Sequence, residues 1–164
     1  MWPAWPHQKK RRERSKQKSD KRAETILRIF LDANVLFSAA RSDGAIRQLL
    51  RELQARKHVL IAGPLVIVEA RRNLENKVNP AALAWLDSML SSMETSASEP
   101  RLVAADVDWL VEKDRHVLRA AIQMRCDVLV TGDATHFGAG YGRTFDGVKI
   151  LSPRMVAEFF LSIS

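Results

Sequence analysis

Short apolar runs alternate with longer amphipathic stretches along the sequence from residue 26 onward. Near-continuous apolar runs are typical of buried strands, and apolar residues spaced three and four positions apart are typical of helices. The apolar runs predict strands at residues 28–31, 58–62, 127–131 and 148–151, with a further short strand at 101–103. The helical spacing predicts helices at residues 45–56, 65–77, 112–125 and 153–163, and one that begins at Pro80. Buried strands separated by helices indicate an α/β fold with a central parallel sheet covered on both faces.

Length and charge divide the chain into two parts. A chain of 164 residues with 46% hydrophobic residues has enough apolar surface for one core, whereas two cores would each be too small. Residues 1–25 hold nine Lys and Arg against three Asp and Glu, so most of the net charge of +7 lies there. We therefore expect a disordered basic arm over residues 1–25 and a folded domain over residues 26–164. The arm is either a nucleic-acid-binding segment or a solvated tail.

Some classes of protein are excluded by what the sequence lacks. No apolar run approaches the roughly 20 residues that span a bilayer, and no apolar segment follows the basic N-terminus. We therefore expect neither a membrane span nor a secretory signal. The single cysteine, Cys126, excludes an internal disulfide and a zinc site made of several thiolates. We expect Cys126 to be buried and the protein to be cytoplasmic.

Two carboxylates directly follow predicted strands. Asp32 comes after the strand at 28–31, and Asp133 comes after the strand at 127–131, across the turn residue Gly132. In parallel α/β sheets, ligands bind at the carboxyl ends of the strands. We therefore expect these two side chains to lie at a ligand site.

Two further carboxylates lie on predicted helices. Asp114 is near the start of one helix, three residues before Val117, and Glu69 lies four residues after Leu65 on another. Residues three and four positions apart share a helix face, so both acids are expected to point toward the packed side. The four carboxylates would then converge at one end of the sheet.

Such a cluster needs a cation or shared protons. Two carboxylates about 4 Å apart repel by about 4 kcal/mol at an effective dielectric constant near 20. Oxygen ligands favour Mg²⁺ or Mn²⁺, which activate water and stabilise charge on a transferring phosphoryl group. The residues therefore indicate metal-dependent phosphodiester hydrolysis. Each acid also has a structural interpretation: Asp114 as a helix cap, Asp133 as a turn former and Glu69 as a surface acid.

The stretch from Phe30 to Leu36 resembles the opening motif of the PIN domain family. A Pro-x-x-x-x-Glu segment ending at Glu69, the Asp114 helix and the run Val130-Thr131-Gly132-Asp133 recur in that order and at similar spacing. The resemblance covers roughly residues 26–160. It implies a three-layer α/β/α sandwich around a parallel sheet, with a Mg²⁺- or Mn²⁺-dependent nuclease site.

The resemblance also implies roles for individual residues. The catalytic metal ligands would be Asp32, Glu69, Asp114 and Asp133, supported by Asn34 and Thr131. Some relatives carry a further acid after the Thr-Gly-Asp segment, where this chain has His136, which is either a phosphate-contacting or proton-transferring group or an ordinary loop histidine. Residues that could contact phosphates are Arg71, Arg72, Arg115, His136 and Arg143. Many bacterial members are RNA-cutting toxins restrained by an antitoxin protein, and many form homodimers.

Other functions remain open at this point. A non-catalytic RNA-binding or regulatory module would use the basic arm and would not need a metal. A dehalogenase-type phosphatase wants Asp-x-Asp at its first strand, but the second residue after Asp32 is Asn34. A phospho-receiver wants an adjacent acid pair, which the sequence before Asp32 lacks. The metal-dependent ribonuclease is therefore the preferred interpretation.

Overall fold

A computed structural model describes residues 25–77, 79–96 and 107–161, and these residues form a six-stranded sheet in the order β3-β2-β1-β4-β6-β5. Neighbouring strands are parallel, except that β5 runs antiparallel to β6 at one edge. The predicted parallel sheet is confirmed, with this one antiparallel strand added. The strands are β1 (Arg28–Leu31), β2 (Val59–Ala62), β3 (Glu94–Thr95), β4 (Val128–Val130), β5 (Thr144–Phe145) and β6 (Val148–Leu151).

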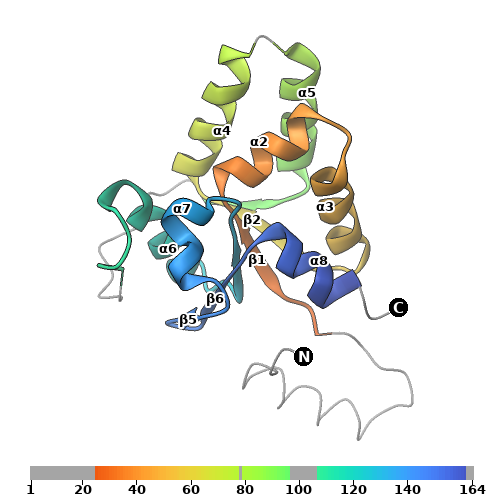
Figure 1. The fold of residues 1–164 in the computed structure, drawn as a ribbon. Helices are drawn as coiled ribbons and strands as arrows, with labels where there is room; N and C mark the ends of the chain where they lie inside the picture. Colours follow the sequence, from red (N-terminus) through yellow and green to blue (C-terminus); the bar gives the residue numbers. More distant parts are fainter. Residues whose placement is uncertain (1–24, 78, 97–106, 162–164) are drawn as a thin grey trace, which may run out of the picture.

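Helices cover both faces of the sheet, which confirms the three-layer architecture (Figure 1). Helices α2, α3 and α8 pack side by side on one face, and α6 and α7 lie on the other (Figure 1). Helices α4 and α5 pack against each other and against α2. The helices are α2 (Ala33–Arg41), α3 (Ala45–Ala55), α4 (Pro64–Asn76), α5 (Pro80–Ser91), α6 (Glu112–Gln123), α7 (Ala134–Phe137) and α8 (Pro153–Leu161), and a 3₁₀ turn spans Gly138–Gly140.

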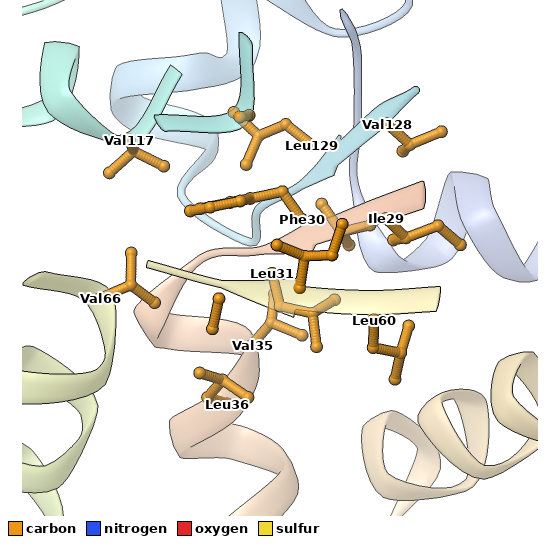
Figure 2. Close-up of a cluster of buried hydrophobic side chains, with 14 of the residues drawn as sticks. Ile29, Phe30, Leu31, Val35, Leu36, Leu60, Val66, Val117, Val128 and Leu129 are labelled. Atoms are coloured by element: carbon orange, nitrogen blue, oxygen red, sulfur yellow. The ribbon is translucent and has the colours of Figure 1, made fainter. Parts of the chain in front are cut away.

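Strand β1 is the centre of the core. Its side chains alternate, so that Phe30 faces the α6 layer beside Leu129, while Leu31 faces the α2 layer beside Val35 and Leu36 (Figure 2). All of these side chains are buried. Because both faces of β1 are covered, its last three residues, 29–31, are all apolar, and the polar residue that follows them marks the edge of the core.

Several elements differ from the sequence prediction. Helix α2 was not predicted, because it begins directly after β1 with no turn residue between them. The edge strand β3 is only two residues long, and the strand expected at residues 101–103 lies outside the described residues, as does the basic arm up to residue 24. The β5–β6 hairpin was also missed. Its two-residue turn has positive φ at Asp146 and Gly147, as a type I′ turn requires.

No helix in the described part of the chain is long and apolar enough to cross a membrane. Cys126 is buried, as expected, in the turn between α6 and β4.

Gly140 provides space for the Trp109 ring, which packs against Phe137 and Phe145. A methyl group on Gly140 would lie 2.5 Å from an atom of that ring, closer than carbon atoms pack. We expect Gly140→Ala to reduce the free energy of unfolding by about 1–3 kcal/mol, measured by urea denaturation. Gly138→Ala is the matched control, because a methyl group there meets nothing within 4 Å. Equal losses in the two variants would contradict this account.

Burial raises the pKa of the Cys126 thiol to about 12. Because only the thiolate is nucleophilic, we expect Cys126 in the folded protein to resist a thiol-reactive disulfide reagent at mildly alkaline pH. The thiol should react fully once guanidinium chloride unfolds the protein. The reaction is measured by the absorbance of the thiolate that the reagent releases. Rapid reaction of the folded protein would show that this turn opens readily.

Candidate functional site

Asp32 joins the end of the central strand to the start of a helix. Its backbone N–H donates to the Val130 carbonyl at 3.0 Å, which extends the pairing of β1 with β4 by one residue. Its side-chain Oδ1 accepts a 2.8 Å hydrogen bond from the Ala33 N–H and so caps α2. Strand and cap together hold the carboxylate at the carboxyl edge of the sheet.

The other oxygen of Asp32 is held by two polar side chains. Oδ2 accepts from the Thr131 hydroxyl at 2.8 Å and from the Asn34 amide at 3.1 Å. The Asn34 carbonyl oxygen in turn accepts from the Gly132 N–H at 2.8 Å. A methyl group at Gly132 would lie 3.2 Å from that oxygen, so glycine allows this close approach. Asn34 and Thr131 thus link the end of β1 to the end of β4.

Asp133 caps the short helix α7. Its Oδ1 accepts from the His136 backbone N–H at 3.2 Å, and its own N–H donates to the Thr131 hydroxyl at 3.2 Å. The remaining oxygen, Oδ2, lies 2.7 Å from His136 Nδ1. The same ring nitrogen lies 3.2 Å from Asp114 Oδ2. His136 is therefore between two of the predicted site acids.

Asp114 lies in the first turn of α6, where exposed N–H groups favour a carboxylate. The cap position itself is taken by Val111, so Asp114 is not the helix cap. Asp114 Oδ2 is buried and has no hydrogen bond to any described atom, because its contact with His136 lacks hydrogen-bond geometry. A buried carboxylate oxygen without a hydrogen bond is costly and suits a cation.

Glu69 is exposed, and the expectation that it points toward the packed side was wrong. That expectation took Leu65 as a core residue, but Leu65 is itself exposed. The buried face of α4 consists of Val66, Ala70 and Leu74. Glu69 is nevertheless close enough to the other acids for its charge to add to the raised pKa of Asp32.

The electrostatics of the site are those of clustered negative charge. Burial raises the pKa of Asp32, the hydrogen bonds from Thr131 and Ala33 oppose this, and the charges of Glu69 and Asp114 add to it. Burial also raises the pKa of Tyr141, as do, to a smaller extent, the charges of Asp133 and Asp32. Among the described residues, no Lys or Arg forms an ion pair with any of the four predicted site acids.

The predicted phosphate-contacting arginines differ in their surroundings. Arg71 pairs with Asp87 of α5 at 2.8 Å, and Arg115 donates to the Leu110 carbonyl at 2.9 Å, so both already have structural partners. Arg72 is exposed on α4. Arg143 is also exposed, with its guanidinium 5.3 Å from the centre of the Phe145 ring. Arg72 and Arg143 are therefore better placed to meet a ligand than Arg71 and Arg115.

Three contacts at the site differ in how far the sequence could indicate them. Tyr141 donates from its hydroxyl to the Thr131 carbonyl at 2.7 Å, and so ties the loop after the 3₁₀ turn to the end of β4. The Asp133–His136 contact has a local signal in the i, i+3 spacing. The Asp114–His136 contact joins distant segments and has none.

The donor set fits a divalent cation. Ligand atoms of Asp114, Asp133 and His136 all lie within 4.8 Å of one another, and Asp114 Oδ2 lacks a hydrogen bond among the described atoms. Carboxylate oxygens are the ligands of hard divalent ions such as Mg²⁺ and Mn²⁺.

Two comparisons with known proteins were informative to different degrees. A search of curated proteins found no match, whereas a family model matches most of the described domain. The family model described as PIN domain matches residues 28–135, from the start of β1 to the second residue of α7. The matched range contains all four predicted acids. The chain therefore belongs to the PIN domain family, whose members are generally nucleases.

Proposed function

We propose that this protein is a metal-dependent ribonuclease that hydrolyses phosphodiester bonds of RNA. The observation that carries the proposal is the gathering of Asp32, Asp114 and Asp133 at one edge of the sheet, with Glu69 in electrostatic range. The described residues supply no Lys or Arg pair to balance these charges, which favours a bound cation.

The residues that would hold Mg²⁺ or Mn²⁺ are Asp32, Glu69, Asp114 and Asp133. When bound, such an ion supplies an activated water and stabilises the negative charge that develops on the phosphoryl group. The chain's own part is to fix the carboxylates in advance. Thr131, which follows β4, and Asn34, in the first turn of α2, hold Asp32 by hydrogen bonds, which limits rearrangement when the site is filled.

Substrate contact would fall to basic side chains near the acids. Arg72 lies on the same helix as Glu69 and is exposed, and Arg143 is exposed on the loop that follows Tyr141. Arginine can make two parallel hydrogen bonds to one phosphate. The basic arm of residues 1–25 would add attraction to a polyanion beyond this domain.

The biological role proposed for this activity is that of a toxin held in check by an antitoxin protein, with a homodimer as the assembled form. This part rests on the PIN family relationship. Expression of the wild-type chain in a bacterial host should then stop growth, whereas an equal amount of Asp32→Asn should not. Equal growth with both would remove the toxin role and leave the nuclease proposal standing.

The nuclease proposal predicts that Asp32→Asn lowers the rate of RNA cleavage by at least about 100-fold. Loss of charge at a metal ligand removes several kcal/mol of transition-state stabilisation, and each 1.4 kcal/mol is tenfold in rate. The measurement is cleavage of a labelled single-stranded RNA with Mn²⁺ or Mg²⁺, with EDTA as a second arm.

Asp43→Asn is the matched control for this experiment. It makes the same chemical change at an exposed acid that pairs with Arg51 after the far end of α2. It should retain full activity. Cleavage that persists in Asp32→Asn or in EDTA would refute the proposal, and cleavage of single-stranded DNA in place of RNA would correct the substrate.

The raised pKa of Asp32 predicts that its ionisation lowers the stability of the fold, although the same charge is needed for the proposed chemistry. Ionised Asp32 is disfavoured in the fold, so its cost is present above the folded-state pKa and disappears as the pH falls below the unfolded value. Without metal, Asp32→Asn cannot ionise at this position and escapes that cost, but its amide group gives up hydrogen bonds that the carboxylate accepts from Ala33, Asn34 and Thr131. The unfolding temperature of the variant minus that of the wild type should therefore rise as the pH is raised from about 4 to neutrality. A difference that stays constant or falls over this range would contradict this prediction.

A further inference from the structure

His136 holds a position between two acids that a folding role does not require. Its backbone N–H already completes the α7 cap by donating to Asp133 Oδ1. Its ring adds a second contact to Asp133, at 2.7 Å, and a contact to Asp114, at 3.2 Å, through the same nitrogen. The ring nitrogen carries at most one proton, so it can donate to only one of these two oxygens.

The Asp114 oxygen is the one left without a hydrogen bond among the described atoms. It is buried, and it faces a nitrogen that is aligned toward Asp133 instead. Hydrogen bonds among Asp114, Asp133 and His136 therefore leave one carboxylate oxygen, Asp114 Oδ2, without a donor. A cation shared by the three ligand atoms would satisfy all of them.

The separations within the group match those of ligands on one ion. Neighbouring ligands of a six-coordinate ion with bonds of about 2.1 Å stand about 3 Å apart. The distances from His136 Nδ1 to the two carboxylate oxygens are 2.7 and 3.2 Å, on either side of that value. All three ligand atoms lie within 4.8 Å of one another, so a small adjustment of the third separation would let one ion reach all three.

We propose that His136 Nδ1 is itself a metal ligand, which completes the site with Asp114 and Asp133 and makes it prefer Mn²⁺ to Mg²⁺. This inference rests on the metal site of the proposed function and adds to it a nitrogen donor and a metal preference. Mg²⁺ binds oxygen ligands almost exclusively and parts with water reluctantly, whereas later divalent ions accept imidazole. In the ligating form the ring carries its proton on Nε2 and presents the Nδ1 lone pair.

The test measures metal binding without RNA. Titration calorimetry of the EDTA-treated protein with MnCl₂ and with MgCl₂ should show Mn²⁺ bound at least about tenfold more tightly, and His136→Ala should reduce this ratio by about tenfold. Thr135→Ala is the matched control, because it is an exposed neighbour on the same helix, and it should leave both affinities unchanged. His136→Asp replaces the nitrogen by oxygen and should recover Mg²⁺ binding with a low Mn²⁺ preference.

A spectroscopic readout reports the nitrogen directly. Pulsed electron paramagnetic resonance of the Mn²⁺-loaded protein should show coupling to a ring nitrogen in the wild type and in Thr135→Ala, and none in His136→Ala. Mn²⁺ binding with no nitrogen coupling would overturn this inference and leave the metal-dependent nuclease standing. Tighter binding of both ions to His136→Ala would also overturn it, because the ring would then be a competitor of the metal.

The remaining outcomes separate the two proposals. Nitrogen coupling in a protein that cleaves no RNA would support the ligand assignment and refute the nuclease. Absence of binding of either ion would refute both.

Discussion

The burial of the Asp32 carboxylate is the constraint on which the candidate site depends. A charge removed from water is costly, and the structure offsets that cost with hydrogen bonds from Ala33, Asn34 and Thr131. Those three donors belong to the segments that follow β1 and β4, so the carboxylate fixes the two central strands relative to each other at their carboxyl ends. The nearby acids oppose this arrangement, since their charges make ionised Asp32 still less favourable. The site thus places electrostatic repulsion at the carboxyl edge of an apolar core.

The sheet edge partly compensates that repulsion before any ion binds. Helices α2, α6 and α7 all begin beside the acids, and each helix start carries partial positive charge from its free N–H groups. Asp32 and Asp133 take up these N–H groups as caps, and Asp114 lies in a first helical turn. The α/β topology therefore delivers the acids and also part of their stabilisation, because the carboxyl end of a parallel strand is where the next helix starts.

The sequence predicts those parts of the site that depend on residues close together along the chain. Asp32 and Asp133 follow apolar strands, and that position alone predicts the sheet edge. The orientation of Glu69 was misjudged because the β-branched run from residue 66 to 68 leaves several possible buried faces, and packing against α2 and α5 decides among them. The β5–β6 hairpin could have been predicted from the Asp146-Gly147 pair, which is typical of a two-residue hairpin turn. The contact of His136 with Asp114 depends on how α6 and α7 pack, which no spacing along the chain reports.

Asp32 and Asp133 serve both the fold and the candidate site, which affects how the sequences of related proteins can be interpreted. Asp32 and Asp133 each cap a helix, so a descendant that lost its chemistry would still keep them for folding. Asp114 and Glu69 accept no such hydrogen bond from any described backbone group, and what the fold gains from their charge is the weaker attraction of Asp114 to the start of α6. Selection for stability alone would let these two positions drift first. In a set of homologues, the acids at positions 114 and 69 would therefore distinguish working enzymes from inactive copies better than the more prominent acids at positions 32 and 133.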